Sequence, residues 1–347
     1  DNSNKGHLIV DATVAPADIK YPTDLDLLSQ SRIKSESLID LLWESKQGRK
    51  KPRTYRRKAK AEYLSVAKIR KKGKKKLRKA IGKQLRYLRR NLGTIGKMLD
   101  EKVSGGFPLT HKDQRTYWII QELYRQQKEM FDNGKHTTAH RIVSISQPHV
   151  RPIVRGKAGK DVEFGAKISL SLVNGLSYLH KISWEAYNES QDLKGQIEDY
   201  KTKYGFYPAN VSADQIYGTH ENRQYMKSKG INFSGVELGR HKQLTDELKV
   251  HLNEKKKKRR ERVKVEGKFG EGKRKYQLDL VMAKRSDTSI SWIGSVFFVM
   301  NIAYLLRVMF LSLIEKVRFY IRIMTSAMNG LILEIDSQNQ QIKPATF

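Results

Sequence analysis

The sequence predicts a mixed α/β fold with a large basic helical insertion after its first strand. Three observations predict this class. Short β-branched apolar runs recur along the chain and are typical of buried strands. Stretches with apolar residues at three- and four-residue spacing separate these runs and are typical of helices. Between residues 49 and 90, lysine and arginine dominate, and Glu62 is the only acidic residue.

The first strand is expected at residues 6–15, where Asp11 interrupts an apolar run. A carboxylate on a central strand is costly to bury unless it is paired or bound to a metal ion. Helical spacing then predicts helices within 24–47 and 114–132. We therefore interpret residues 24–140 as one helical insertion.

The basic region at residues 49–90 interleaves its cations with apolar residues at roughly helical spacing, which predicts a basic amphipathic helical region. Such a surface suits the DNA backbone, because phosphate contacts supply most of the sequence-independent affinity. A helix on an RNA or a membrane surface is the alternative. The cations expected to contact DNA are Arg56, Arg57, Lys74, Lys75 and, from a later loop, Arg155.

Strand signals return at residues 141–146, and a loop rich in proline, glycine and cations follows at 147–160. Residues 162–174 and 176–184 predict a hairpin, because Asn174-Gly175 is a strong turn pair. Four further elements complete this region: a helix at 192–204, a short strand at 210–217 that carries Asp214, a helix at 220–229 and a strand at 231–235.

The charge of the chain points to a polyanionic partner. The formal net charge is +32 over 347 residues, far more than solubility requires. Nucleic acid is the first candidate, and an anionic membrane surface is the second. The chain has no cysteine, which excludes disulfides and cysteine-based zinc sites and is compatible with a reducing cytoplasm.

The C-terminal region contains an uncharged stretch from Thr288 to Leu306 and an apolar run from Val308 to Ile314. Its length suits a membrane span. Serine and asparagine side chains interrupt it, however, Arg307 splits it, and its apolar residues keep helical spacing. We therefore expect residues 288–347 to form a buried core helix and a tail, with a membrane span as the alternative.

Arg262, Glu266 and Lys273 stand at i, i+4 and i+11, which places them on one face of a helix. A carboxylate between two cations suits a metal ion held beside a phosphate, because the carboxylate can bind the ion and the cations can bind phosphodiester oxygens. A salt-bridged surface helix is the alternative. Lys255 and Arg259, in the cation block just before this helix, are also expected to contact DNA.

Asp11 and Asp214 each stand at or near the end of an apolar strand. If these strands are neighbours, the two aspartates can share a pair of divalent ions about 3.5–4 Å apart, and Glu266 can complete the second site. Ligands that are all oxygen favour Mg²⁺ or Mn²⁺ over zinc. Taken singly, Asp11 is also explained as a strand-end cap and Asp214 as a helix N-cap.

In this order the motifs resemble those of DDE transposases of bacterial insertion sequences, in the IS-five-like branch with an RNase H-like catalytic core. Leu8-Ile-Val-Asp11-Ala-Thr resembles the motif of the first catalytic aspartate, and Val211–Tyr217 resembles that of the second. Arg262-x3-Glu266-x6-Lys273 matches the family's Arg–Glu–Lys signature in spacing and identity. Val162–Lys167 resembles the family's second strand, and Ser183–Glu189 resembles the turn beyond the third.

The resemblance implies an RNase H-like core made of residues 5–23 and 141–287, with Asp11, Asp214 and Glu266 as catalytic ligands of two Mg²⁺ or Mn²⁺ ions. The implied enzyme cleaves DNA at transposon ends and joins the 3′-OH to target DNA by transesterification. Its implied partners are double-stranded DNA, at terminal inverted repeats and at the target, and a second copy of the chain. We expect it in the bacterial cytoplasm, at the nucleoid, without a membrane.

Two positions depart from the family pattern. Arg259 stands where the signature often has tyrosine, and Gln215 stands where lysine is usual, which puts the positioning of the DNA end in doubt. The family tends to carry a helical DNA-binding domain before its first catalytic strand, and we expect this domain to be missing here. A catalytically inactive DNA-binding remnant is the main alternative, and a basic membrane-surface protein that uses residues 288–314 is a further one.

Overall fold

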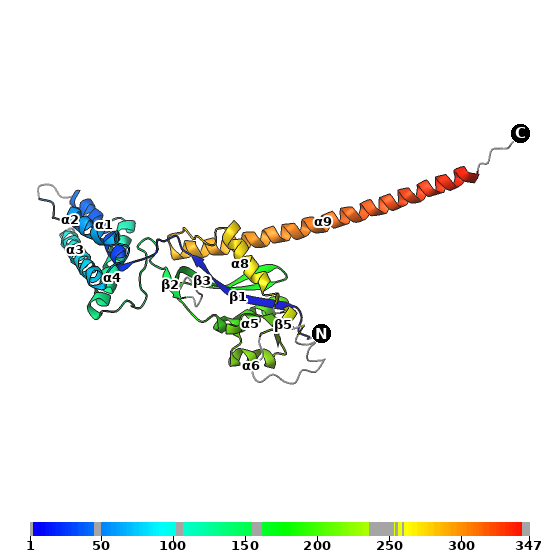
Figure 1. The fold of residues 1–347 in the computed structure, drawn as a ribbon, viewed down its shortest axis with the longest axis horizontal. Helices are drawn as coiled ribbons and strands as arrows, with labels where there is room; N and C mark the ends of the chain where they lie inside the picture. Colours follow the sequence, from blue (N-terminus) through cyan, green and yellow to red (C-terminus); the bar gives the residue numbers. More distant parts are fainter. Residues whose placement is uncertain are drawn as a thin grey trace.

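The computed structural model describes residues 3–44, 50–101, 107–154, 162–235, 253, 256–258 and 260–341. Figure 1 shows a helical bundle, a mixed sheet with flanking helices, and a long C-terminal helix that extends from the sheet. The curled mixed sheet with helices on its faces is consistent with an RNase H-like fold, which confirms the predicted fold class.

The sheet is centred on the first strand of the chain. Its strands are β1 (His7–Pro16), β2 (Arg151–Val154), β3 (Val162–Val173), β4 (Leu176–Ser183), β5 (Asn210–Ser212) and β6 (Asn232–Phe233). They are arranged in the order β2-β3-β1-β5-β6, and β4 pairs with β3 outside this path. Strand β1 runs antiparallel to β3 and parallel to β5. The apolar runs predicted as strands therefore bring Asp11 to the middle of the sheet.

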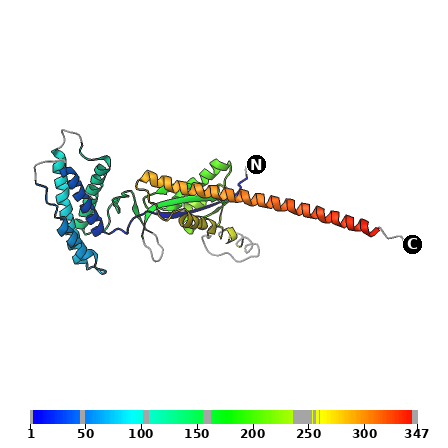
Figure 2. The ribbon, with the colours of Figure 1, turned by 90° about the horizontal axis from the view of Figure 1, so that it is seen from above.

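Helices cover both faces of this sheet (Figure 2). On one face, strand residues such as Ile168 and Leu170 pack against α8 (Val263–Lys275) and the start of α9 (Ser286–Gln341). On the other face, Leu8 and Val10 pack against the helices α5 (Leu193–Tyr204) and α6 (His220–Ser228). The sheet is thus buried on two sides, as expected for strands that read as nearly continuous apolar runs.

The predicted insertion forms a bundle with its own apolar core. It consists of α1 (Asp24–Glu44), α2 (Arg56–Ala67), α3 (Lys74–Asp100) and α4 (His111–Asn133). Leucine and isoleucine side chains of α1, α3 and α4 meet in one buried cluster. A buried ion pair joins Arg32 to Glu36 at 2.5 Å, and the Arg32 Nε donates to Gln84 Oε1 at 3.1 Å. Because the buried guanidinium is paired and hydrogen-bonded, its burial between α1 and α3 is tolerated.

The strand predicted at residues 141–146 is wrong, because these residues form no strand in the structure. Their apolar side chains are instead buried outside the sheet, and Ile142 and Ile145 join the core of the bundle. The Ile142 amide donates to the Gln126 side chain at 2.9 Å instead of to a neighbouring strand. Strand β2 follows at Arg151–Val154, within the segment predicted to be a loop.

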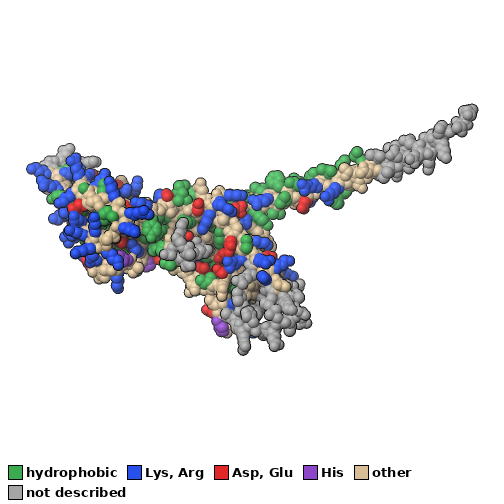
Figure 3. All heavy atoms as spheres, in the orientation of Figure 1, with side chains coloured by type: hydrophobic (Ala, Val, Ile, Leu, Met, Phe, Trp, Pro, Cys, Tyr) green, Lys and Arg blue, Asp and Glu red, His purple; other side chains and the backbone are tan. Residues whose placement is uncertain are grey.

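The prediction of a buried C-terminal helix is also wrong for most of its length. Helix α9 buries Ser289, Ile293, Val296, Phe297 and Met300. From Leu305 to Met328 its apolar side chains are exposed, because the helix continues past the sheet and has no described element beside it (Figures 1 and 3). By length and composition, Ser286–Asn329 could cross a membrane, and only 11% of its apolar window is buried.

Candidate active site

The site begins beside the end of β5, next to the central strand β1. Strands β1 and β5 pair up to Ile9 and Ser212. Asp11 lies two residues beyond Ile9, and Asp214 lies two residues beyond Ser212. Because paired positions of parallel strands advance together, Asp214, just beyond the end of β5, comes level with Asp11 on β1. The shared register explains why two motifs about 200 residues apart in the sequence meet.

Glu266 reaches the same place from helix α8. This helix turns Val265, Phe269 and Gly272 toward the sheet, at the i, i+4, i+7 spacing of one helical face. At Gly272 a Cβ atom would lie 3.2 Å from Leu278 Cδ2 and 3.3 Å from Met300 Sδ, so the glycine allows this close packing. With its apolar side fixed, the helix directs Glu266 toward the two aspartates.

The guanidinium of Arg262 lies between the carboxylates. Its Nη1 donates to Asp214 Oδ1 at 2.8 Å, and its Nη2 donates to Glu266 Oε1 at 2.8 Å. Asp11 is close enough for the charge of Arg262 to act on its carboxyl group. The structure therefore gathers all three predicted carboxylates around one predicted cation, and the pair with Glu266 is the i, i+4 salt bridge considered in the alternative reading.

Asp11 is the most shielded of the three carboxylates. Burial raises the pKa of its carboxyl to about 6, and the neighbouring charges of Asp214 and Glu266 also raise this pKa. A hydrogen bond from the Ala12 amide, 2.8 Å from Oδ1, and the charge of Arg262 lower it. The Asp11 carboxyl is therefore ionised near neutral pH and becomes protonated as the pH falls below about 6.

Asp214 also fulfils the alternative role proposed for it, because it caps a short 3-10 helix at Gln215–Tyr217. Its Oδ1 accepts a hydrogen bond from the Gln215 amide at 2.6 Å in addition to the one from Arg262. The side chain is 50% exposed. Capping fixes one oxygen of Asp214 in place and leaves the carboxylate accessible.

Lys273 lies near the same strand as Asp11. Its Nζ donates to Thr13 Oγ1 at 3.1 Å, and Thr13 is two residues beyond Asp11 on β1. Residues two apart in a strand share a face of the sheet, so Lys273 adds positive charge on the side that carries Asp11. Arg262 and Lys273, which stand at i and i+11 in the sequence, are thus both oriented toward β1.

A set of hydrogen bonds that the sequence did not predict holds the start of α8 against the strands. His7 on β1 contacts Glu261 at 3.1 Å and Ser212 Oγ at 2.8 Å. The Ser212 hydroxyl also donates to the Lys258 carbonyl at 3.1 Å. These contacts place the backbone just before Arg262. A single histidine and a single serine give no sequence signal for this role, which depends on the β1–β5 pairing.

The oxygen donors fit a hard divalent cation. Asp11 Oδ2, Asp214 Oδ2 and Glu266 Oε2 accept no hydrogen bond from any described residue, and carboxylate oxygens are what Mg²⁺ and Mn²⁺ prefer. Within the described part of the chain, no group of three histidine or acidic side chains is spaced to hold a metal ion. Arg262 stands between Asp214 and Glu266.

A second group of buried polar side chains lies beside Asp11. The Tyr217 hydroxyl has no hydrogen-bond partner among the described residues, and burial together with the charge of Asp11 raises its pKa. Nearby, the ring of Tyr187 lies 4.9 Å from Lys167 Nζ and 4.0 Å from Lys181 Nζ. Tyr187 belongs to the turn that resembled the family pattern, whereas the position of Tyr217 beside Asp11 was not predicted.

Apart from Arg262 and Lys273, the cations predicted to bind DNA fall into three groups. Arg57, Lys74 and Lys75 are exposed on α2 and α3, on the basic bundle shown in blue in Figure 3. Arg56 instead makes a two-pronged ion pair with Asp40, at 2.7 and 3.0 Å, and this pair lowers the pKa of Asp40. Arg155, Lys255 and Arg259 lie outside the described residues.

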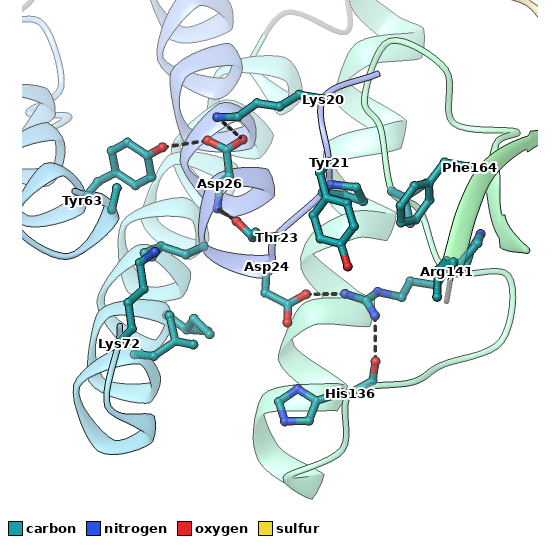
Figure 4. Close-up of a pocket in the computed structure, with 18 residues that line it drawn as sticks. Lys20, Tyr21, Thr23, Asp24, Asp26, Tyr63, Lys72, His136, Arg141 and Phe164 are labelled. Carbon is teal, nitrogen blue, oxygen red and sulfur yellow. Dashed lines mark hydrogen bonds and ion pairs between the residues drawn. The ribbon is translucent and has the colours of Figure 1, made fainter. Parts of the chain in front are cut away.

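A cavity of about 520 Å³ lies between the bundle and the core (Figure 4). Its polar side chains pair with one another: Arg141 bonds to Asp24 at 2.7 Å, and Tyr63 donates to Asp26 at 2.7 Å. None of the three site carboxylates lines this cavity. We therefore interpret it as a structural junction that is separate from the candidate active site.

Comparison with known proteins supports the same region. Residues 211–303 match the family model of the transposase DDE domain. The matched segment contains Asp214, Arg262, Glu266 and Lys273, while Asp11 precedes it. No curated protein and no solved structure matches the chain. The match supports a DDE transposase, and with it a nuclease function related to transposition, DNA as a partner and the divalent ions that this family generally uses.

Proposed function

We propose that this protein is a transposase of the IS-five-like branch that cleaves DNA at transposon ends and transfers the 3′ ends into target DNA. One observation carries the proposal. Asp11, Asp214 and Glu266, from distant parts of the sequence, surround Arg262 where β5 ends beside the central strand β1. Two of these carboxylates lie in the segment that matches the transposase DDE domain.

In the proposed mechanism, Asp11, Asp214 and Glu266 would hold two Mg²⁺ or Mn²⁺ ions, which would supply positive charge for the attacking group and the leaving 3′ oxygen. Asp11 contributes a negative charge once the pH exceeds its pKa of about 6. Lys273, held at Thr13, and Arg262 supply positive charge for the phosphates next to the scissile bond. Water attack gives cleavage, and 3′-OH attack on target DNA gives strand transfer.

The proposed substrate is double-stranded DNA, at the terminal inverted repeats of the element and at the target. Arg57, Lys74 and Lys75 are exposed on the bundle, where they can contact phosphates without unfolding any described element. Because two transposon ends must be joined in one event, we propose a homodimer on DNA, in the bacterial cytoplasm at the nucleoid.

A catalytically inactive DNA-binding remnant is the second candidate. It is favoured by the spacing of the carboxylates, which does not match a metal site within the described residues. It is also favoured by the two ion pairs of Arg262, which satisfy Asp214 and Glu266 without a metal ion. This candidate predicts DNA binding that weakens with salt and no metal-dependent cutting.

DNA nicking separates the two candidates. The substrate is a duplex that joins the element's terminal repeat to flanking DNA, incubated with Mn²⁺ or with EDTA. We expect the parent chain to nick the duplex only with Mn²⁺, and Asp11→Asn, Asp214→Asn and Glu266→Gln each to reduce nicking at least about 100-fold, because each removes a charge at the metal site.

Asp132→Asn is the matched control. Asp132 is an exposed aspartate on α4 that pairs with Lys128, outside the site. It should cut like the parent. Salt-sensitive DNA binding by every chain, with cutting by none, would favour the inactive remnant. Cutting that survives the site substitutions would reject the proposed assignment of the three carboxylates.

A further inference from the structure

The Arg262 side chain occupies one oxygen each of Asp214 and Glu266, two of the three carboxylates proposed to hold metal ions. Its two terminal nitrogens bond Asp214 Oδ1 and Glu266 Oε1, both at 2.8 Å, so one guanidinium joins two of the three carboxylates. The charge of Arg262 also acts on Asp11. The positive charge of this arginine therefore stands where three negative charges converge, which is the electrostatic position of a divalent cation.

Arg262 and a divalent ion compete for this position for two physical reasons. A carboxylate oxygen that accepts a charge-assisted hydrogen bond from Arg262 must give up that bond, or share it, to ligate a metal ion. The two cations would also repel each other at the separation that shared ligands impose. Within the described residues, no three histidine or acidic side chains are spaced to hold a metal ion, and Arg262 bridges two of the three site carboxylates.

The local structure lets the Arg262 side chain leave without disturbing the fold. Arg262 is the N-cap residue of α8, and its side chain is 24% exposed. The carboxylates of Asp214 and Glu266 are 50% and 51% exposed, so the ion pairs face solvent. The backbone before Arg262 is held by other contacts, among them those of His7 and Ser212. Movement of the side chain therefore leaves these backbone contacts in place.

We propose that Arg262 is a displaceable counter-ion: in the metal-free protein it bridges Asp214 and Glu266, and loading of divalent ions moves it off both, onto a DNA phosphate. This inference rests on the proposed function, because it takes Asp214 and Glu266 as metal ligands. It assigns Arg262 two successive partners, carboxylate and then phosphate, and it links metal binding to DNA binding through one side chain. Arg262 also partly neutralises the negative charges of the carboxylates before the ions bind.

The test is Mn²⁺ affinity of the full chain without DNA, measured from the loss of the electron paramagnetic resonance signal of free Mn²⁺. The variants are Arg262→Gln, which removes the competing cation, and Arg262→Lys, which keeps the charge but cannot bridge with two nitrogens. We expect Arg262→Gln to bind Mn²⁺ about three- to tenfold more tightly than the parent, as expected for the loss of two partly exposed ion pairs. Arg262→Lys should lie between the two.

Arg125→Gln is the matched control. Arg125 also joins two carboxylates, Glu122 at 2.6 Å and Glu129 at 3.3 Å, but on the exposed face of α4. Its loss should leave Mn²⁺ affinity unchanged. Circular dichroism melting of each variant establishes that the fold is retained, so that affinities are compared between folded proteins.

Weaker or equal Mn²⁺ binding by Arg262→Gln would overturn the inference, because it would show that Arg262 positions the carboxylates for the ion instead of competing with it. The same experiment also tests the proposed function, through the Mn²⁺ affinity of Asp214→Asn. If Asp214→Asn binds Mn²⁺ as well as the parent, Asp214 is not a ligand, and the metal-site assignment fails together with the inference. Tight binding that is lost in Asp214→Asn but not strengthened in Arg262→Gln rejects the displacement alone.

The link to DNA gives a second readout. With Ca²⁺ in place of Mn²⁺, binding of a DNA duplex can be followed by fluorescence anisotropy with little cutting. We expect the metal to increase the DNA affinity of the parent more than that of Arg262→Gln, because only the parent gains a released guanidinium for phosphate. An equal increase in both proteins would contradict the second step of the inference, in which Arg262 transfers to phosphate.

Discussion

Asp11 lies on the central strand of the sheet, and burial raises the pKa of its carboxyl to about 6 from an ordinary value of 3.8. In the unfolded chain the group ionises at the lower pH. Between about pH 4 and pH 6 the unfolded chain therefore loses a proton that the folded chain retains, and the free energy of unfolding decreases as the pH rises. Above pH 6 the full cost of the buried charge is present.

This cost predicts that Asp11→Asn stabilises the metal-free protein at neutral pH while removing a site carboxylate. In EDTA, we expect its free energy of unfolding at pH 7.5 to exceed that of the parent by about 1–3 kcal/mol, because a shift of one pKa unit corresponds to about 1.4 kcal/mol. Near pH 4 the difference should vanish. Urea titrations at the two pH values measure this. The same difference at both pH values would show that the burial of charge is not its cause.

At the scale of single residues, much of the site could be predicted from the sequence. Asp11 and Asp214 stand out because acidic side chains are rare in or beside apolar strands, and the spacing of Arg262 and Glu266 on a helix predicts their i, i+4 pair. The bond between Arg262 and Asp214 could not be predicted in the same way. It depends on the parallel pairing of β1 with β5, which no local pattern encodes.

At the scale of elements, the pairing of β1 with β3 holds Asp11 in place. At the end of that pairing, the two strands come so close that only glycine fits at position 165. Gly165 is opposite Pro16 in the register. A Cβ atom at Gly165 would lie 2.0 Å from the Ala15 carbonyl oxygen and 2.8 Å from Pro16 Cα. These are backbone atoms of a central strand, so they cannot give way as a flexible side chain would.

We therefore expect Gly165→Ala to lower the free energy of unfolding by about 1–3 kcal/mol or more, as overpacking does. Gly93→Ala is the control, because Gly93 lies in α3 with nothing within 4 Å of an added Cβ. It should raise the free energy of unfolding by about 0.5–1 kcal/mol through helix propensity. Chemical denaturation of both variants tests this, and similar small effects would contradict the register-based explanation.

Element prediction from the sequence succeeded where periodicity and burial agree, as for β1, the β3–β4 hairpin and α4. It failed at residues 141–146. An apolar β-branched run is as compatible with an irregular segment buried against a neighbouring bundle as it is with a strand. Ile142 and Ile145 are indeed buried, but in the core of the bundle. An apolar pattern indicates burial without specifying the surface that provides it.

At the scale of the whole molecule, positive charge and apolar surface lie on different parts. The bundle carries the basic surface, while exposed apolar side chains follow α9 beyond the sheet (Figure 3). The apolar character of α9 was evident in the sequence, whereas its exposure follows from the end of the sheet beneath it. The prediction that no membrane is involved stays a prediction, because Ser286–Asn329 is long and apolar enough to span one.

The basic surface predicts how DNA affinity depends on salt. Lys74 and Lys75 are exposed at the start of α3, so the double change Lys74→Gln and Lys75→Gln should remove up to two phosphate contacts. We expect the slope of log affinity against log salt to become shallower by about one to two. Lys128→Gln on α4, which breaks a surface pair with Asp132, should leave the slope unchanged. An unaltered slope in the double variant would show that DNA does not contact Lys74 and Lys75.

We propose that the carboxylates around Arg262 form a metal-dependent DNA-cleaving site. The most direct test of this proposal is the rate at which 3′-OH ends form at the junction of element and flanking DNA in Mn²⁺, for the parent chain and for Asp214→Asn. Our account predicts cutting at that junction by the parent and at least about a 100-fold slower rate for the variant. Equal cutting by both proteins would contradict it.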